Sequence, residues 1–315
     1  MLAKESKALV LRYFQDFANG NQDLAILKEI TSPQMVDHTF MEGLFPTPHQ
    51  RGVGEALPDM YDALEVIAAA DDQVAVRVVG NGTHTGGAFF GMPATGKRVT
   101  WTSTILWQTA NGKISERWNV LDFLSLMIQL GVVPPFKHVI LPIMPEGVRL
   151  RGLTSKQEAH SVSNAQDQLK PLIHFIEALQ TGNLTRLEEI VAPDYIDHGG
   201  WIDGLPGGPE GIKQEVTMVR TAFPDLELRV PHLFVAGEYV VLGMEEVGTH
   251  RDEIFGVPAT HKQAKWMTMG IYKVEDGKIK ERWIDATRAH LLRQLGAIPP
   301  IPFDFITRIR PEFLL

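Results

Sequence analysis

The amino-acid sequence repeats itself at a nearly constant offset. Lys113-Ile114 with Glu116-Arg117-Trp118 returns as Lys278-Ile279 with Glu281-Arg282-Trp283, at an offset of 165 (118 to 283). This period lies far above the roughly 20–50 residues of solenoid and propeller repeats, so the repeated unit is a whole domain. The sequence therefore predicts one domain design used in tandem, and any site should be sought twice.

Other short motifs return at nearly the same offset. They are Asp37-His38 with Asp197-His198, Thr83-His84 with Thr249-His250, Gly-x-Pro-Ala-Thr at 91–95 and 256–260, Trp101 with Trp266, and Gln-Leu-Gly at 129–131 and 294–296. The register breaks in a stretch that contains Pro142, Pro145 and Gly147. We therefore predict a first domain over residues 1–135, a linker over 136–165 and a second domain over 166–315.

Composition narrows the class of partner. The formal charge of −8 comes from 38 acidic and 30 basic residues without a Lys/Arg block, which argues against nucleic acid as a partner. An apolar run of about 18 residues for a membrane span is missing, and the first residues lack the apolar stretch of a signal peptide. The absence of cysteine excludes disulfides, thiol catalysis and thiolate metal sites. We expect a cytoplasmic protein whose partner is a small molecule.

Each copy is predicted to begin with helices and to continue with strands. Leu9, Tyr13 and Phe17 recur at helical spacing, and a third helix is expected over Val53–Ala69 and, in the second copy, Gly211–Phe223. The β-rich runs that follow turn at Asn111-Gly112 and Asp276-Gly277, which are strong hairpin signals. A closing helix then ends at Leu-Gly, with Pro-Pro just beyond it. This order predicts the α+β class.

The ordered set of motifs resembles the SnoaL-like polyketide cyclases of the nuclear transport factor 2-like superfamily, and the resemblance covers both copies. The resemblance implies that each copy is a cone-shaped α+β barrel, in which about three helices wrap a curved antiparallel sheet around an apolar pocket. Members of the family often pair through their sheets. A tandem chain is therefore expected to form this pair internally, as a pseudo-dimer, or to act as a homodimer.

The same resemblance implies a catalytic strand, Lys-Ile-x-x-His-x-Asp, whose Asp moves a proton during intramolecular aldol ring closure. On this chain the His position is occupied by Arg117 and Arg282, and the Asp position by Asn119 and Ile284. Asn119 forms hydrogen bonds but does not titrate near neutral pH, and Ile284 does neither. Arg117, Asn119 and Arg282 are thus predicted to bind substrate, and the acid must come from elsewhere.

Two acids near this strand are candidates. Asp285 follows the lost acid by one residue, so strand alternation puts it on the face of Trp283 unless a bulge re-aims it. Asp122 precedes the closing helix, and its counterpart is Thr287. Because Asp and Thr are both favoured N-caps, a capping role competes with a catalytic role for Asp122.

The Asp-His pairs are titratable in both copies. His38 and His198 could act as acid or base near neutral pH, with Asp37 or Asp197 fixing the tautomer, while a structural histidine is the competing interpretation. His84 and His250 could meet them across the cavity. This spacing is not a recognised zinc pattern, so we predict no metal site and no cofactor.

The second copy carries more polar groups that could line a pocket. Glu245-Glu246 interrupts an apolar strand, so alternation directs one of the two carboxylates inward, where burial would raise its pKa. A sheet edge or an ion pair with Arg229 or Arg251 is the alternative for this pair. Further candidates for contact with substrate are aromatic, and their competing role is in the core: Trp101, Trp201, Trp266 and Tyr272.

These observations leave three hypotheses about function. The first is an acid/base enzyme without cofactor, of cyclase or isomerase type, acting on a small apolar metabolite such as a polyketide or terpenoid. The second is water addition of the epoxide-hydrolase type, which would need an Asp-Arg-Asp arrangement drawn from Arg77 or Arg282 with Asp122 or Asp285. The third is a non-catalytic binding or scaffold protein, because both copies lack the cyclase acid.

Overall fold

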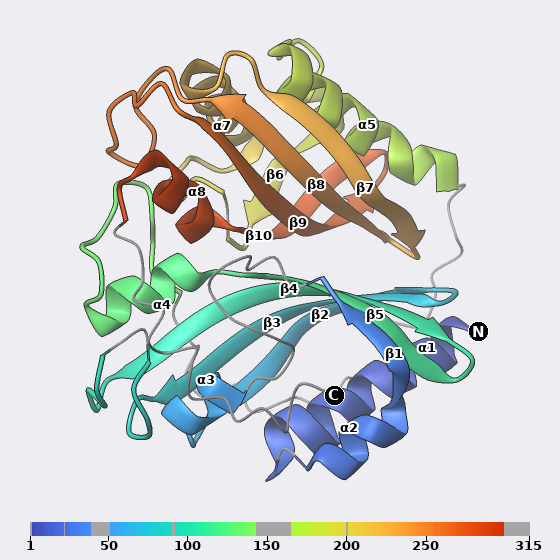
Figure 1. Ribbon diagram of the computed structural model, residues 1–315. Coiled ribbons are helices and arrows are strands. Elements are labelled where there is room, and N and C mark those ends of the chain that lie inside the picture. The colour runs from blue at the N-terminus through green and yellow to red at the C-terminus, as the bar shows by residue number, and fades with distance from the viewer. Residues whose placement is uncertain are drawn as a thin grey trace.

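The computed structural model describes residues 2–21, 23–38, 51–89, 92–142, 165–199 and 201–298, and it contains two copies of one α+β unit (Figure 1). The first copy comprises α1 (Ala3–Arg12), η1 (Tyr13–Asn21), α2 (Leu24–Ile30), β1 (Thr31–Asp37), α3 (Arg51–Ala56), β2 (Tyr61–Ala70), β3 (Gln73–Thr83), β4 (Arg98–Ala110), β5 (Lys113–Leu121) and α4 (Phe123–Leu130). The second comprises α5 (Ala165–Thr181), α6 (Leu187–Ile190), β6 (Val191–Asp197), α7 (Gly208–Ala222), β7 (Glu227–Ala236), β8 (Tyr239–Thr249), β9 (Gln263–Glu275), β10 (Lys278–Ala286) and α8 (Arg288–Leu295). The predicted tandem α+β organisation is confirmed.

The two sheets share one topology. Their strand orders are β1-β5-β4-β3-β2 and β6-β10-β9-β8-β7, each with five strands. The expectation of purely antiparallel, barrel-like sheets was wrong in two respects. The strand that follows the second helix runs parallel to the last strand, as β1 with β5 and β6 with β10. In the described residues, both sheets stay open at their edges rather than closing into a barrel.

Local turn chemistry follows the sequence closely. Asn111 and Gly112 adopt positive φ of 52° and 74°, and Asp276 and Gly277 adopt positive φ of 50° and 71°. Two consecutive left-handed residues form the turn that matches the twist of a hairpin, so these dipeptides join β4 to β5 and β9 to β10. The closing helices end at Gly131 and Gly296, with φ of 87° and 84°, as the Leu-Gly signals predicted.

The repeated Gln-Leu-Gly motif also has a structural role. The Gln129 side chain receives a hydrogen bond from the Thr100 amide at 2.9 Å and donates one to the Thr100 carbonyl at 2.6 Å. Gln294 makes the same two bonds to the backbone of Lys265, at 3.0 and 2.6 Å. Each closing helix is thus hydrogen-bonded to the backbone of the middle strand of its sheet, which is β4 in the first copy and β9 in the second.

The third helix was predicted correctly in the second copy and wrongly in the first. Gly208–Ala222 forms α7, whereas α3 ends at Ala56 and residues Tyr61–Ala70 form strand β2. Pro58 interrupts helical hydrogen bonding at this point. Strand β2 then pairs with β3 over its whole length, from Tyr61 opposite Asn81 to Ala70 opposite Gln73.

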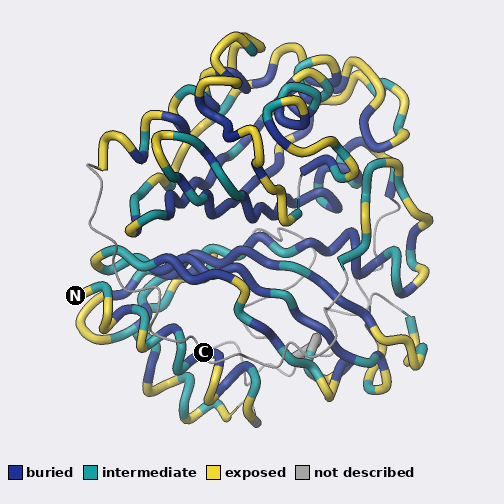
Figure 2. Tube along the Cα trace, turned by 180° about the vertical axis from the view of Figure 1, so that it is seen from behind, coloured by how far each residue is buried: buried dark blue, intermediate teal, exposed yellow. Residues whose placement is uncertain are grey.

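The two sheets face each other, and most of the helices cover their outer faces (Figure 1). Buried residues concentrate along the facing strands (Figure 2). One hydrophobic cluster joins the sheets directly, with Ala75 and Leu106 of the first packed against Met269 and Ile271 of the second. A second cluster joins α4 to α8. The chain therefore forms an internal pseudo-dimer whose two halves share these two clusters, while each half also keeps an inner core of its own.

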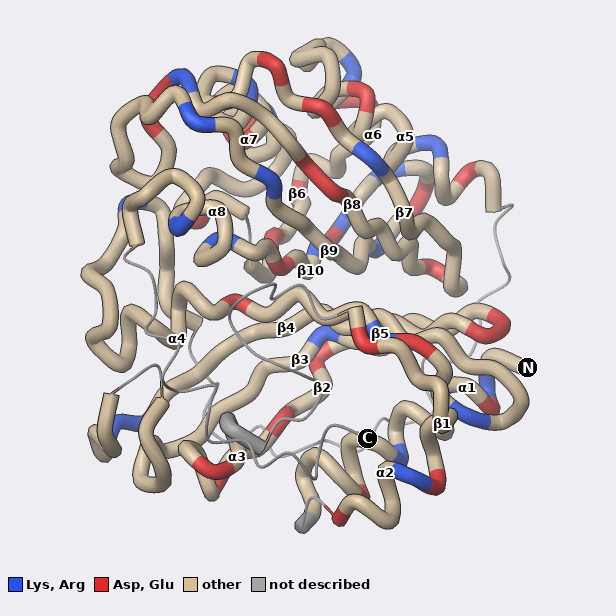
Figure 3. The backbone as a smooth tube through the Cα atoms, viewed as in Figure 1, with Lys and Arg blue, Asp and Glu red and all other residues tan. Residues whose placement is uncertain are grey.

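The segment after the first copy lies against the second. Lys137 Nζ contacts Glu253 Oε1 at 2.8 Å, and the Ile140 amide donates to Asp203 Oδ2 at 3.0 Å. Residues 143–164, most of the predicted linker, lie outside the described residues. Among the residues that are described, no helix has the length and apolarity to cross a membrane. Figure 3 shows basic and acidic residues interspersed along both copies.

Candidate functional site

A pocket of about 390 Å³ lies where the second copy meets the first; we call it the junction pocket. Most of its wall comes from β6, α7, β10 and the residues that follow β6. The first copy adds Arg77, Thr102 and Asp122, and the connecting segment adds residues 140–142. The pocket reaches Ile284 on one face of β10 and Asp285 on the other, so it passes around the end of that strand.

Inside the second copy, Arg282 lies between two carboxylates. Its Nη1 and Nη2 donate to Glu215 Oε1 and Oε2 at 2.9 and 2.6 Å, and Nη2 also contacts the Asp197 carboxylate. Arg282 is fully buried and Glu215 is 4% exposed, while both acids line the junction pocket. Burial raises the pKa of the Glu215 carboxyl above its ordinary value, against the opposing effect of the Arg282 guanidinium. The site thus holds a buried, oriented carboxylate that can exchange a proton with a molecule in the pocket.

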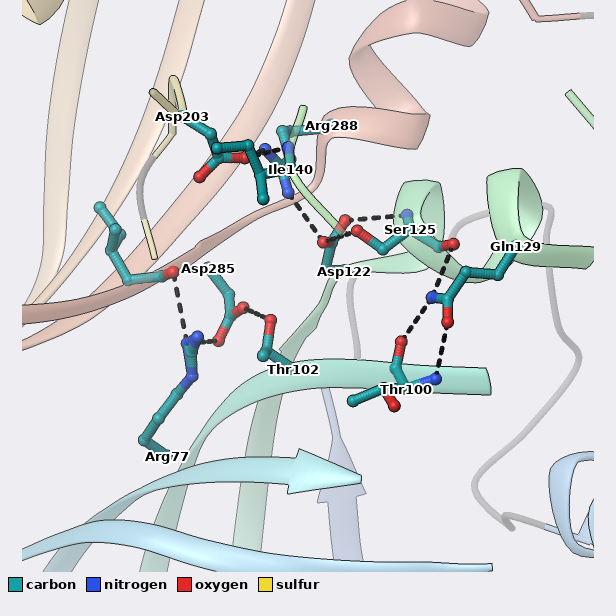
Figure 4. Close-up of polar contacts among 11 residues, drawn as sticks. Arg77, Thr100, Thr102, Asp122, Ser125, Gln129, Ile140, Asp203, Asp285 and Arg288 are labelled. Atoms are coloured by element: carbon teal, nitrogen blue, oxygen red, sulfur yellow. Dashed lines mark hydrogen bonds and ion pairs between the residues drawn. The ribbon is translucent and has the colours of Figure 1, made fainter. Parts of the chain in front are cut away.

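A second buried ion pair crosses between the copies. Arg77 Nη1 of β3 donates to Asp285 Oδ2 of β10 at 2.8 Å, and the Thr102 hydroxyl donates to Asp285 Oδ1 at 2.6 Å (Figure 4). The Thr104 hydroxyl donates to Asp285 Oδ2 at 2.7 Å. As alternation predicted, Asp285 lies on the face of Trp283, which is the face turned toward the first copy. Burial raises the pKa of Asp285, while Arg77 and the two hydroxyls oppose that shift.

Arg288 makes a third arrangement of this kind at the start of α8. Its Nη2 contacts Asp122 Oδ2 at 2.7 Å and its Nη1 contacts Asp203 Oδ2 at 2.8 Å (Figure 4). Asp122 is also the N-cap of α4, because its side chain accepts a hydrogen bond from the Ser125 amide at 3.3 Å. The capping interpretation is confirmed for Asp122. Thr287 stands at the corresponding position without capping α8, and its hydroxyl instead receives the Met267 amide at 3.0 Å.

The repeated Asp-His pairs separate within the strand, as alternation allows. Asp37 contacts Arg117 and Asp197 contacts Arg282 on the inner face of each sheet. His38 instead contacts Glu116 at 2.8 Å and stacks on Trp118, and His198 contacts Glu281 at 2.7 Å and stacks on Trp283. The aspartates therefore do not fix the histidine tautomers. His198 is among the residues that line the junction pocket.

His84 and His250 hold the loops that carry the Gly-x-Pro-Ala-Thr motif. His84 Nδ1 lies 3.1 Å from Thr95 Oγ1, and His250 Nδ1 lies 3.0 Å from Thr260 Oγ1. The expectation that they meet the other histidines across the cavity was wrong, since each ring is bonded to its own loop. Burial lowers the pKa of His250.

Of the Glu245-Glu246 pair, Glu246 points inward and is 5% exposed, whereas Glu245 points outward and its Oε2 lies 3.6 Å from Lys265 Nζ. Burial raises the pKa of Glu246 well above its ordinary value. Three of the four aromatic candidates belong to the core cluster shared by the copies, and the fourth to the inner core of the second copy: Trp101, Trp201 and Trp266, and Tyr272.

The inner face of the first copy differs from that of the second. Arg117 contacts Asp37 and donates to the Tyr13 hydroxyl at 3.2 Å, while the Ser103 hydroxyl donates to Asn119 Oδ1 at 2.5 Å. Its unexpected group is Asp62 on β2, which is 4% exposed and whose Oδ1 has no hydrogen-bond partner among the described residues. Burial raises the pKa of Asp62 from 3.8 to about 7.

The raised pKa of Asp62 determines in which direction the stability of the protein changes with pH. The folded protein keeps a proton on Asp62 that the unfolded chain loses, so the free energy of unfolding should fall as the pH rises from about 4 to about 7. We expect Asp62→Asn to remove this component and to raise stability at pH 8, measured by urea unfolding. Asp59→Asn is the control with opposite sign, because Asp59 accepts hydrogen bonds from Thr83 at 2.5 and 2.7 Å. If Asp62→Asn and Asp59→Asn changed the free energy of unfolding at pH 8 equally, the raised pKa of Asp62 would be contradicted.

Sequence reasoning missed Glu215, Asp62 and the bridging role of Arg288. A signal existed for Glu215, which shares one face of α7 with Ile212, Val216 and Val219 and so stands as an acid on an apolar stripe. Asp62 and Arg288 gave a weaker signal, because their partners or their burial depend on how the copies pack.

The comparisons with known proteins agree with this duplicated geometry. Nogalonic acid methyl ester cyclase of Streptomyces nogalater is 29% identical over 133 residues, covering 41% of this chain and 96% of that protein. Aklanonic acid methyl ester cyclase DnrD of Streptomyces peucetius is 26% identical over 140 residues, covering 43% and 94%. The solved structure of TsrD from Streptomyces laurentii has 25% identity and a TM-score of 0.40, and the match covers 44% of this chain and 99% of TsrD.

Each of the two cyclases is matched over nearly its whole length by less than half of this chain. A family model described as SnoaL-like polyketide cyclase matches the chain twice, over residues 8–130 and 172–295. The two matches together span most of the sequence, in the same two units that the fold shows. The chain belongs to the SnoaL-like polyketide cyclase family, as a tandem member with two copies of the domain.

Proposed function

We propose that the second copy catalyses a proton-transfer reaction of cyclase or isomerase type on a polyketide-like molecule bound in the junction pocket. The observation that carries this proposal is Glu215, a buried carboxylate that lines the pocket and is held by both nitrogens of Arg282. A carboxylate whose pKa burial raises above its ordinary value is suited to general acid/base work. The named activities of the two cyclase relatives support the class of substrate.

In this proposal Glu215 removes a proton from a carbon next to a ketone of the substrate. The electron pair of that C–H bond forms the new C–C bond at a second carbonyl carbon, whose oxygen takes up the proton as the ring closes. Arg282 keeps Glu215 ionised and oriented between these events. Glu215 on α7 thereby takes the proton-transfer role that the resemblance to the family implies for an acid on the last strand, where this chain has Ile284.

A second candidate is water addition, which has its own support in the structure. Acid-arginine-acid arrangements occur twice beside the pocket, as Asp197–Arg282–Glu215 and as Asp122–Arg288–Asp203. Two carboxylates that share an arginine can orient and deprotonate a water molecule. The mass of the product separates the two candidates, since ring closure leaves the mass unchanged and hydration adds one water.

The test uses the purified full chain with nogalonic and aklanonic acid methyl esters, followed by mass spectrometry and absorbance. We expect Glu215→Gln to lower kcat/KM by about 100-fold, because the amide cannot take up the proton. The control is Glu210→Gln, an exposed residue on the same helix, which should leave turnover unchanged. Turnover by Glu215→Gln at the normal rate would contradict the assignment of Glu215 as the catalytic base. Binding of the esters without turnover in the unmodified chain would favour a non-catalytic binding protein.

A further inference from the structure

Three of the described buried residues on the inner wall of the second copy carry polar atoms that lack a hydrogen-bond partner, although the Thr268 hydroxyl lies near enough to the Glu246 carboxyl to oppose the rise of its pKa. These atoms are the hydroxyls of Tyr195 and Tyr272 and the Oε2 atom of Glu246, none of which has a hydrogen-bond partner within the part of the chain that the structure describes. All three residues are at least nine-tenths buried, at 4%, 1% and 5% exposed. A buried polar atom without a partner costs free energy, so such atoms are rare unless a ligand or water completes them.

The three groups belong to one wall by strand register. Tyr272 on β9 lies directly opposite Arg282 on β10, and Glu246 on β8 lies opposite Trp266 on β9. The Tyr272 ring lies over Gly270, where a Cβ atom would come within 2.8 Å of its Cε2 atom. The ring thus leans along β9 from Arg282 toward the Glu246 end. Tyr195 on β6 lines the junction pocket, and so do Glu215 and Asp197, which hold Arg282 opposite Tyr272; Tyr272 and Glu246 lie behind these residues.

None of these groups is repeated in the first copy. The corresponding positions, by the same strand pairings, hold Met35 for Tyr195, Trp107 for Tyr272 and Gly80 for Glu246. At Gly80 the space is taken by the Trp101 ring, which would lie 2.1 Å from an added Cβ atom. The strand order is duplicated, but the three polar groups occur in the second copy alone.

We propose that Tyr195, Tyr272 and Glu246 form an oxygen-binding subsite that receives a phenol or ketone oxygen at the inner end of an aromatic, polyketide-like ligand. This inference rests on the proposed function, since it places the ligand in the same site with its inner ring against this wall. Tyrosine hydroxyls donate and accept, and a carboxyl does both once it carries a proton, so the wall suits either kind of oxygen. Burial favours that protonated form of Glu246, because it raises the pKa of the group.

Tyr272→Phe tests the subsite because it removes only the unpartnered hydroxyl. The probes are 2-naphthol and 2-methylnaphthalene, which differ by a hydroxyl in place of a methyl group, and their binding is followed by tryptophan fluorescence or calorimetry. We expect the unmodified chain to prefer 2-naphthol by about tenfold and Tyr272→Phe to lose that preference. We also expect the midpoint of urea unfolding of Tyr272→Phe to stay unchanged or to rise.

The matched control is Tyr13→Phe in the first copy, whose hydroxyl is bonded to Arg117 at 3.2 Å. That variant should unfold at lower urea concentration and keep the preference for 2-naphthol. The proposal is overturned if the unmodified chain binds the two probes equally or binds neither, or if Tyr272→Phe retains the preference. Probe binding requires no turnover, so a negative result here leaves the role of Glu215 standing, and a normal rate in Glu215→Gln leaves this subsite standing.

Discussion

Arg77→Met should lower the free energy of unfolding by about 3–5 kcal/mol, because it leaves the Asp285 carboxylate buried without its cation. Both side chains of this pair are almost completely buried, at 1% and 2% exposed. Thr102 and Thr104 would still donate hydrogen bonds to Asp285, but neither carries a compensating charge. The measurement is urea unfolding at neutral pH.

The double variant Arg77→Met/Asp285→Asn isolates the ionic contribution. Asparagine removes the charge, keeps one acceptor oxygen for one threonine hydroxyl and offers its NH2 group to the other hydroxyl, which can turn to accept, so the double variant should recover at least half of the lost stability. Lys137→Met is the control, because it breaks an exposed ion pair with Glu253 and should have little effect. A double variant as unstable as Arg77→Met would show that the guanidinium contributes mainly through packing.

Neither member of this ion pair has a counterpart in the other copy. The residue that corresponds to Arg77 is Gly243, and the residue that corresponds to Asp285 is Val120, by the pairings of the two sheets. A repeated sequence predicts a symmetrical pair of domains, so it gives no hint of contacts that exist on one side only. This is why the motifs located both domains while the ionic contacts between them were found only in the structure.

The wrong prediction of a helix where strand β2 lies has a related cause. Strand β2 has its inner face on the core of its own copy and its outer face near the other sheet, so residues on both faces are buried, as Ile67 on the inner face and Val66 and Ala68 on the outer face illustrate. A strand covered on both faces loses the alternation that marks strands in a sequence. The run that results can be taken for a helix.

Where one face of a strand differs clearly from the other, alternation was a reliable guide. It placed Asp285 with Trp283 and required one of Glu245 and Glu246 to point inward, and both expectations hold in the structure. The sequence placed Arg282 at the family's histidine position but did not predict its ion pair, because its partner Glu215 lies on a helix 67 positions away. Sequence spacing does not report which helix covers the open end of a sheet.

Arg282→Met should be more damaging than Arg77→Met, at about 5 kcal/mol at neutral pH, because it leaves two carboxylates, Glu215 and Asp197, close together without their shared cation. Repulsion from Asp197 and burial then both favour the protonated form of Glu215 in the folded state. The folded pKa of Glu215, which burial already raises, should rise further above its unfolded value, so that folding takes up a proton. Stability is then retained at low pH and lost as the pH rises.

The pH dependence is what separates this electrostatic effect from a packing defect. A packing defect in Arg282→Met would lower the free energy of unfolding by the same amount at pH 4.5 and at pH 8, whereas loss of the shared cation should cost far more at pH 8. Urea unfolding at the two pH values decides between them. Lys213 lies on α7 like Glu215 and forms a surface ion pair with Glu188 of α6, so Lys213→Met should change little at either pH. The steep loss in Arg282→Met alone would identify Arg282 as the group that keeps Glu215 charged and buried at the floor of the junction pocket.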